Sequence, residues 1–209
     1  MTETLEMKNS PTKSEATAAR IVAAAQRLFL AKNYADVTTD MIAQAAEVTK
    51  GGLYHHFASK ERLYSTMMLG DLERKRVLFA EAVASPGTCE FRLAMLTRAF
   101  LELPDEEREL TRLVRRDINT FTGEERNLLV LAYQRALPDQ VQTIVEDGIR
   151  KGELAPGDPR VLAWSFVALV EVSIGDYAGN VFGNTDASLE HVLGLFFHGA
   201  AANPTGELS

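Results

Sequence analysis

Apolar residues recur at intervals of three and four along most of this chain, and this spacing limits the possible folds more than any other feature. It places apolar side chains on one face of an α-helix, whereas a strand would need strict alternation. The clearest stripes run through residues 21–29, 93–103 and 110–121. No stretch shows strand-like alternation or an internal repeat. We therefore predict an all-α protein, whose 46% of hydrophobic residues suffice for a packed core.

Capping residues and helix breakers divide this pattern. We expect Ser14 to cap the first helix. Pro138 should kink or split a helical segment over residues 124–151, because proline lacks an amide donor and clashes with the preceding turn. The later segments, residues 158–182 and 187–200, are apolar nearly all round. Such helices must be covered by the core or by another subunit.

The most informative stretch contains two short helices joined by a two-residue turn. Thr38 or Thr39 is expected to cap the first, residues 40–46, and Thr49 the second, residues 50–56. Two short helices with a tight turn between them are typical of the helix-turn-helix, which lays its second helix in the major groove of DNA. The sequence therefore predicts a DNA-binding domain.

The residue types of this stretch suit contact with a duplex. Helix N-termini offer amide groups and a positive dipole end to phosphate. Gly51 and Gly52 each cost about 1 kcal/mol in a helix relative to alanine, and a close approach of the backbone to DNA would explain them. One of the two adjacent histidines should face DNA and the other should pack, in an order that the sequence does not decide. The predicted DNA contacts are Thr38, Thr39, Gln44, Thr49, Lys50, Gly51, Gly52, Tyr54, His55, His56 and Lys60.

At these residues the chain resembles the TetR family of transcriptional regulators. The pattern is Thr-Thr-x-x-Ile-Ala-x-x-Ala over residues 38–46, then Val-Thr-x-Gly-x-Leu-Tyr-x-His-Phe-x-Ser-Lys-Glu-x-Leu over 48–63. The match covers roughly residues 14–64, and the remainder agrees in helix number and lengths. The resemblance implies about nine helices, a homodimer formed through the last two, and DNA-reading heads that a ligand swings apart. It also implies phosphate contacts by Thr39, Tyr54, one histidine and Lys60, and base contacts near Thr49, Lys50 and Gly51.

One position departs from the family pattern. Members usually carry glycine in the turn between the two helices, where this chain has Glu47. If the turn is left-handed, a side chain there costs roughly 1 kcal/mol. An acidic group would also lie near phosphate, so we expect Glu47 to point back to Lys50 or to another base.

Charge is distributed unevenly along the chain. Residues 1–64 carry 8 Lys and Arg against 7 Asp and Glu, whereas residues 65–209 carry 14 against 22. A basic face on the first part can attract phosphate while the acidic remainder limits nonspecific adhesion to DNA. We expect a disordered arm over residues 1–13, a helix-turn-helix domain over 14–62, a ligand-binding and dimerisation domain over 63–202, and a disordered tail over 203–209.

The second part offers candidate ligand contacts. Asp117 lies on an apolar helix face, where a buried carboxylate needs a partner, either a ligand or an arginine. Arg115 and Arg116 can be solvated charges or can recognise an anion, and Glu171 can line a pocket or a dimer interface. The aromatic candidates can instead belong to the core or to a subunit interface. The predicted effector site consists of Phe79, Phe91, Phe100, Arg115, Asp117, Phe121, Trp164, Glu171 and Tyr177. Its apolar majority favours a hydrophobic or amphipathic effector.

Other features argue against further chemistry. His191 and His198 share a helical face but fall short of the three or four ligands of a zinc site, so we expect neither metal nor cofactor. Cys89 lacks a basic neighbour and is expected to be an ordinary buried cysteine. The longest apolar stretch, residues 161–170, is half the roughly 20 residues of a membrane span. With one cysteine and no leader pattern, we expect a cytoplasmic protein without a membrane partner.

The leading hypothesis is a ligand-responsive transcriptional regulator, most readily a repressor. It would bind a palindromic operator as a homodimer, with its two recognition helices in successive major grooves about 34 to 36 Å apart. One alternative is an all-α enzyme with Asp117, Glu171 or Asp176 as general base, although no nucleophile and base are grouped in the sequence. Another is a regulator that activates, or that answers to a protein partner.

Overall fold

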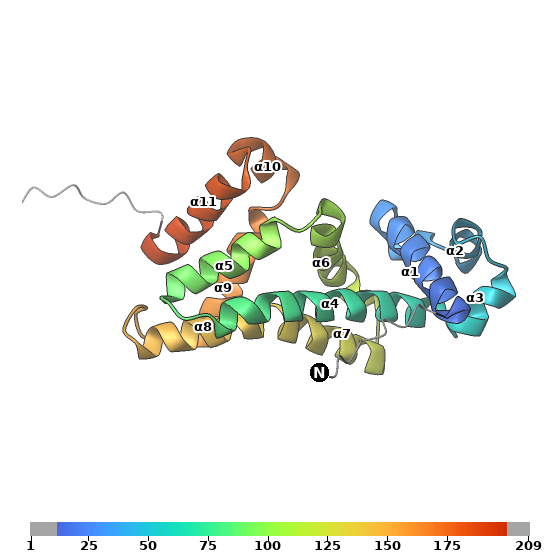
Figure 1. The fold of residues 1–209 in the computed structure, drawn as a ribbon, viewed down its shortest axis with the longest axis horizontal. Coiled ribbons are helices and arrows are strands. Elements are labelled where there is room, and N and C mark those ends of the chain that lie inside the picture. Colours follow the sequence, from blue (N-terminus) through green and yellow to red (C-terminus); the bar gives the residue numbers. More distant parts are fainter. Residues whose placement is uncertain (1–11, 200–209) are drawn as a thin grey trace, which may run out of the picture. The chain divides into compact units, whose positions relative to one another are not determined.

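The computed structural model describes residues 12–199, and every regular element in that range is a helix (Figure 1). The chain divides into two compact units, residues 1–68 and 69–209. The predicted tail and all but the last two residues of the predicted arm lie outside the described residues. The predicted all-α class is confirmed.

The first unit is a small helical domain. It consists of α1 (Lys13–Ala31), the 3₁₀ turn η1 (Tyr34–Asp36), α2 (Thr39–Ala45), α3 (Lys50–His56) and the beginning of α4 (Lys60–Ala84). The expected cap at Ser14 is wrong, because Thr12 caps α1 instead. The Thr12 hydroxyl accepts a hydrogen bond from the Glu15 amide, and the Glu15 carboxylate accepts one from the Thr12 amide. This reciprocal capping box satisfies two amides that the helix leaves unpaired.

An aromatic cluster forms part of the core of this unit. Phe29 lies 5.6 Å from Tyr34 and 5.0 Å from Tyr64 between ring centroids, and the two tyrosine rings lie 5.2 Å apart. From α3, Leu53 is fully buried and the following Phe57 is buried as well. These two residues hold α3 against its own domain, as their spacing of four predicts.

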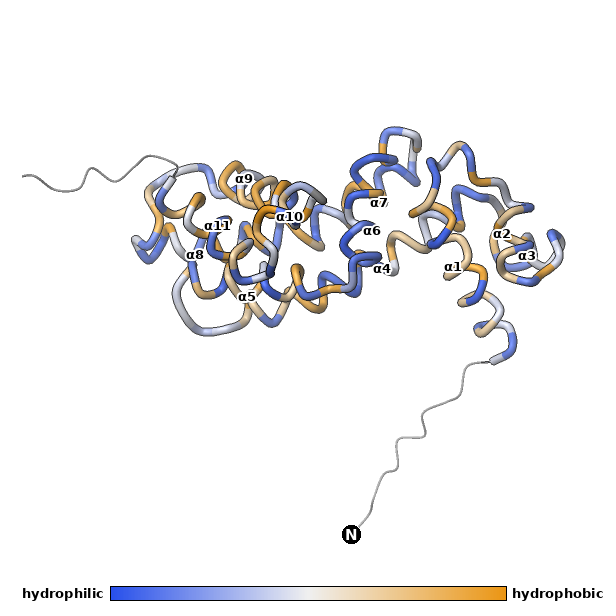
Figure 2. Tube along the Cα trace, turned by 90° about the horizontal axis from the view of Figure 1, so that it is seen from above, coloured by the Kyte–Doolittle hydropathy of each residue, from blue (hydrophilic) through white to orange (hydrophobic). Residues whose placement is uncertain are grey.

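The second unit contains the remaining helices. They are the rest of α4, α5 (Cys89–Leu101), α6 (Asp105–Asp117), the 3₁₀ turn η2 (Ile118–Thr120), α7 (Gly123–Ala136), α8 (Pro138–Arg150), α9 (Pro159–Val172), α10 (Asp176–Phe182) and α11 (Thr185–His198). The helix α8 packs along α9, and α5 contacts both α8 and α11. The apolar helix α9 contrasts with the strongly polar α6 (Figure 2). Across residues 12–199, no helix combines the length and apolar character that crossing a bilayer requires.

The described residues form eleven α-helices, where the resemblance implies about nine. Pro138 splits the predicted segment over residues 124–151 into α7 and α8, and it occupies the first turn of α8, where its missing amide does no harm. The segment over residues 158–182 is also divided, because α9 ends at Val172 and α10 begins at Asp176. Gly152 follows α8 with φ 75°, a left-handed conformation that suits a helix stop.

A buried ion pair within α4 is linked to α6 by a hydrogen bond inside the second unit. Lys75 Nζ contacts the Asp71 carboxylate one turn earlier, and both side chains are nearly inaccessible, at 2% and 1% exposure. Lys75 also donates a hydrogen bond of 2.6 Å to the Glu107 carbonyl at the start of α6. Burial raises the pKa of Asp71 and lowers the pKa of Lys75, while their mutual attraction opposes both changes.

Candidate DNA interface and ligand cavity

The helices α2 and α3 and the loop between them have the geometry of a helix-turn-helix. Thr38 caps α2 by accepting a hydrogen bond of 3.2 Å from the Met41 amide, which decides between the two threonines. Thr49 caps α3 as predicted, accepting from the Gly52 amide at 3.0 Å. Glu47 has φ 54°, so the turn is left-handed where the family usually carries glycine.

The outward face of α3 is exposed. Tyr54 is 44% exposed, and its hydroxyl lies 3.3 Å from the Thr39 hydroxyl of α2. His55 is exposed and His56 is half-buried. Gln44 on α2 is exposed as well. The polar residues of this face therefore stand in solvent, within reach of a bound molecule.

The two adjacent glycines of α3 differ in the space that surrounds them. A Cβ on Gly52 would lie 3.2 Å from the Thr49 hydroxyl oxygen, so the cap itself favours glycine there. A Cβ on Gly51 would meet nothing closer than that oxygen at 4.0 Å. Packing within the domain therefore explains Gly52 but not Gly51.

Lys50 at the start of α3 pairs with α2. Its Nζ lies 3.0 Å from the Asp40 carboxylate, and the side chains remain 54% and 65% exposed. The hydrogen bond from the lysine to Asp40 raises the pKa of Lys50. The expected pairing of Glu47 with Lys50 is thus wrong, because Asp40 occupies the Lys50 ammonium.

Lys60 is held by contacts within the first unit. Its Nζ donates hydrogen bonds to the carbonyls of Tyr34 and Val37, at 2.9 and 3.0 Å. The same ammonium lies 4.1 Å from the centre of the Tyr34 ring. These contacts fix the beginning of α4 to η1, and the phosphate contact of Lys60 stays a prediction.

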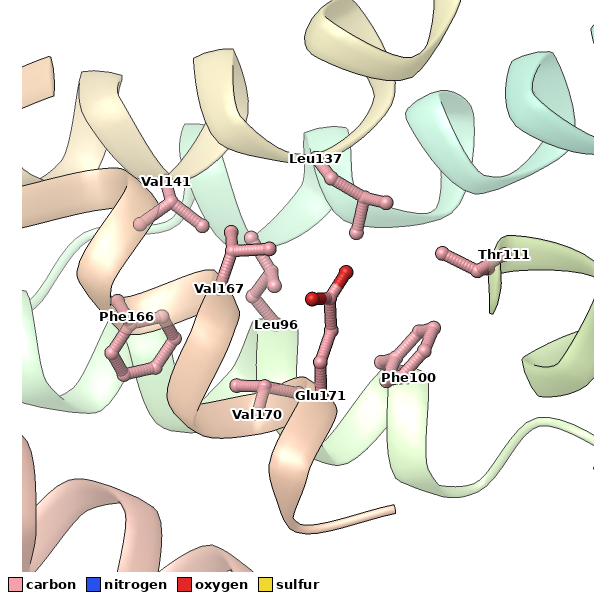
Figure 3. Close-up of a pocket in the computed structure, with 9 residues that line it drawn as sticks. All are labelled: Leu96, Phe100, Thr111, Leu137, Val141, Phe166, Val167, Val170 and Glu171. Atoms are coloured by element: carbon pink, nitrogen blue, oxygen red, sulfur yellow. The ribbon is translucent and has the colours of Figure 1, made fainter. Parts of the chain in front are cut away.

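The second unit encloses a cavity of about 20 Å³, which has room for about one water molecule. It lies among α5, α6, α8, the residue before α8, and α9 (Figure 3). Seven of its nine lining residues are apolar, and Thr111 and Glu171 are the others. The lining consists of Leu96, Phe100, Thr111, Leu137, Val141, Phe166, Val167, Val170 and Glu171.

The structure gathers only part of the predicted effector site. Phe100 and Glu171 line the cavity, and the fully buried Phe79 lies behind Phe100 with 6.2 Å between ring centroids. Phe91 and Tyr177 are 53% and 83% exposed and do not line this cavity. Helix periodicity gives the face of a residue but does not show which faces meet.

The other predicted contacts lie away from the lining. Asp117 is buried and accepts two hydrogen bonds from the Arg116 guanidinium, at 2.7 and 2.9 Å, which favours the internal-pair alternative over a ligand contact. Phe121 is buried outside the cavity lining. Trp164 is half-buried and its ring lies 6.0 Å from that of Tyr133.

Glu171, which lines the cavity, belongs to a polar cluster. The Tyr133 hydroxyl of α7 donates a hydrogen bond of 2.8 Å to Glu171 Oε1, and Arg115 of α6 forms an ion pair with Glu171 Oε2. Burial raises the pKa of the Tyr133 phenol, which keeps it a donor, although the nearby Arg115 guanidinium opposes the shift. Arg115 is therefore one predicted residue that reaches the site through another side chain.

Sequence reasoning missed two polar residues of this site, Thr111 and Tyr133, and six of the seven apolar lining residues. The Thr111 hydroxyl is buried at the cavity and finds no hydrogen-bond partner among the described residues. Its position three before Val114, within an apolar stripe, was the available signal. Tyr133 carried no such signal, since its partner Glu171 lies 38 positions away.

Residues 12–199 hold no group of three or more metal-ligating side chains close enough for one ion. Cys89 is buried, and burial raises the pKa of its thiol to about 11, which agrees with the expected ordinary cysteine.

A helix-turn-helix unit followed by a helical unit with an internal cavity defines the class of DNA-binding regulators with a sensor domain. The family model described as "Bacterial regulatory proteins, tetR family" matches residues 21–67, and a "Tetracyclin repressor-like, C-terminal domain" matches residues 86–174. The chain belongs to the tetR family of bacterial regulatory proteins.

Curated relatives match this chain over different lengths. The HTH-type transcriptional regulator UidR of Escherichia coli is 34% identical over 77 residues, which are 37% of this chain and 39% of UidR. The match thus spans about two fifths of that relative. The uncharacterized regulator YhgD of Bacillus subtilis is 24% identical over 159 residues, covering 75% of this chain and 82% of YhgD.

Solved structures share the fold over most of the chain. AibR, solved with isovaleryl coenzyme A and operator DNA, has a TM-score of 0.74 at 23% identity and covers 87% of this chain and 98% of its own. FadR of Bacillus subtilis, solved with stearoyl-CoA, has a TM-score of 0.73 at 18% identity and covers 88% and 99%. These likenesses establish the fold.

Proposed function

We propose that this protein is a ligand-responsive transcriptional repressor that binds a palindromic operator as a homodimer and is released by a hydrophobic or amphipathic effector. The observation that carries the proposal is the exposed face of α3. Leu53 and Phe57 anchor the helix from behind, while Gly51, Tyr54 and His55 stand in solvent. An anchored short helix with a small, polar outer face fits a major groove.

DNA binding requires Lys50 to change partners, and the energetics permit it. Exposed ion pairs contribute about 0 to 1 kcal/mol, so leaving Asp40 costs little. A lysine contact to a phosphate or to a guanine edge replaces it in the complex. Thr49 and Tyr54 are the proposed neighbouring contacts, with Thr39 held beside the Tyr54 hydroxyl.

The effector binds in the cavity of the second unit. About 20 Å³ is too small for any effector, so binding must select a conformation in which the lining helices have separated. An effector that fits only this expanded conformation shifts the population toward it, by its difference in affinity for the two states. AibR and FadR were each solved in complex with an acyl-CoA. An acyl thioester is therefore the first class of effector to test.

Exposed apolar residues support the homodimer. Val172 at the end of α9 is 77% exposed, and Tyr177 and Val181 on α10 are 83% and 58% exposed. Large apolar side chains gathered in this way on neighbouring helices mark an interaction surface. A second copy of the chain is the proposed partner, as the family resemblance implies.

The test is a titration of the purified protein against fluorescent duplexes from the DNA upstream of its coding region. We expect submicromolar binding to an inverted repeat, two chains for each site in sedimentation, and an affinity that falls steeply with salt. A scrambled duplex is the control. Equal affinity for both duplexes would refute operator binding, and a promoter fusion that loses expression when the gene is deleted would show an activator.

A further inference from the structure

We propose that the cavity selects an apolar effector that places an uncharged oxygen-containing group against Thr111, and that it excludes a free carboxylate. The group can be the oxygen of an ester, a thioester or an alcohol. This inference rests on the proposed function for the idea that the cavity is the effector site. It adds the chemical class of the group that the site recognises.

Thr111 is the first reason. It is 1% exposed, its hydroxyl lacks a hydrogen-bond partner within residues 12–199, and it lines the cavity. A helical threonine can bond the carbonyl four residues earlier, but the Glu107 carbonyl already accepts the Lys75 ammonium at 2.6 Å. A buried hydroxyl without a partner destabilises the protein, and valine at the same position would avoid that cost. A ligand oxygen would supply the missing partner.

Glu171 is the second reason. Its carboxylate points into the space between Phe100, Leu137 and Thr111 (Figure 3). Tyr133 and Arg115 each donate to one of its oxygens, contacts that suit an ionised carboxylate. Like charges repel strongly in an apolar surrounding. A ligand carboxylate in the cavity would therefore meet a fixed negative charge, whereas an ester oxygen or a hydroxyl would not.

Arg115 is not available to pair with an anion inside the cavity. Its guanidinium already pairs with Glu171, and 49% of its side chain is exposed at a surface hollow that Arg112 also lines. A negative charge on the ligand can meet these two arginines from the solvent side. An effector with three parts would thus match the protein. Its apolar part would lie in the cavity, its uncharged linkage would meet Thr111, and a remote anionic part would meet the two arginines at the surface.

The test uses three ligands of one chain length, octanol, methyl octanoate and sodium octanoate, at a pH where octanoate is ionised. Trp164, the single tryptophan, lies 6.0 Å from Tyr133 and reports binding by fluorescence. We expect wild-type protein to bind octanol and methyl octanoate at least about tenfold more tightly than octanoate. The variant Thr111→Val should weaken binding of the two uncharged ligands about three- to tenfold, and Thr111→Ser should not.

A charge variant tests the exclusion independently. Glu171→Gln retains an acceptor for Tyr133 and leaves Arg115 without its carboxylate, so octanoate should bind this variant at least about tenfold more tightly than wild type. Octanoate binding to wild type as tightly as octanol, unchanged ligand binding by Thr111→Val, or no binding of any ligand would each overturn the proposal. Operator titrations of the same proteins report separately on the proposed function, because DNA binding without ligand does not depend on this selectivity.

Discussion

The proposed DNA surface and the cavity are built in opposite ways. On the DNA surface, polar groups find partners nearby in the chain, 3 positions apart for Thr49 with Gly52 and 10 apart for Lys50 with Asp40. In the cavity, Tyr133 and Glu171 come together from 38 positions apart. The first surface is thus assembled largely by local contacts, whereas the second exists only when distant helices have packed.

The same contrast holds for the ion pairs of the two units. Lys50 and Asp40 are 54% and 65% exposed, whereas Lys75 and Asp71 are 2% and 1% exposed. Water screens the first pair and can replace either partner, but it cannot reach the second. The DNA surface can therefore exchange its contacts at little cost, while the sensor unit resists change unless a ligand compensates.

The largest effect on stability is expected when the buried ion pair is broken. Asp71→Ala should lower the free energy of unfolding by about 3 to 5 kcal/mol, because it leaves the Lys75 ammonium buried with the Glu107 carbonyl as its remaining partner. Chemical denaturation measures the loss. The double variant Asp71→Leu with Lys75→Met should recover most of it, and a loss below about 1 kcal/mol in the single variant would contradict the burial of this pair.

Gly51→Ala should separate stability from DNA binding. Its Cβ meets no atom closer than 4.0 Å, so the better helix propensity should raise the free energy of unfolding by about 0.5 to 1 kcal/mol. If the backbone approaches a duplex there, operator affinity should fall about tenfold or more. Gly52→Ala is the matched control, since its clash with the Thr49 hydroxyl removes the stability gain. Unchanged operator affinity of Gly51→Ala would remove this residue from the interface.

Glu47→Gly should stabilise the first unit by about 1 kcal/mol, because φ 54° is strained for any residue with a side chain. Thermal or chemical denaturation detects the gain. Glu47→Ala removes the charge but keeps the strain, so it should show no comparable increase. Equal gains in the two variants would mean that the charge of Glu47, and not its backbone conformation, destabilises the first unit.

The smallest effect is expected for the exposed pair. Asp40→Asn should change the free energy of unfolding by less than about 1 kcal/mol. Because it frees the Lys50 ammonium, it should tighten binding to a nonspecific duplex by about two- to fivefold at low salt. Binding titrations at two salt concentrations measure this change, and weaker binding would show that Asp40 positions Lys50 for DNA.

The helix-turn-helix could be predicted from the sequence because its signals are short-range. A cap acts within three residues, as Thr49 does on Gly52, and a turn is specified by its own residues. Even the left-handed turn at Glu47 could be anticipated from the family pattern. The error at this surface, the expected pairing of Glu47 with Lys50, arises because the Lys50 ammonium reaches a carboxylate of the preceding helix, 10 positions away.

The cavity could be predicted only in part. Phe100 and Glu171 were found because their polarity or size stands out in a helical stripe, whereas Phe91 and Tyr177 share those features and are exposed. Periodicity assigns a residue to a face, but it does not say which face of which helix is covered. Thr111 became visible only when its hydroxyl was found buried without a partner.

The amino-acid sequence by itself determined the helical class, the two short capped helices and the surface that they present, because capping and helix period act within a few residues. Tertiary structure alone decided that Arg115, Tyr133 and Glu171 meet beside an apolar cavity, and that Asp71 and Lys75 are sealed from water. Those contacts depend on how separate helices pack, and the energy of a polar group is set by whether that packing leaves it a partner.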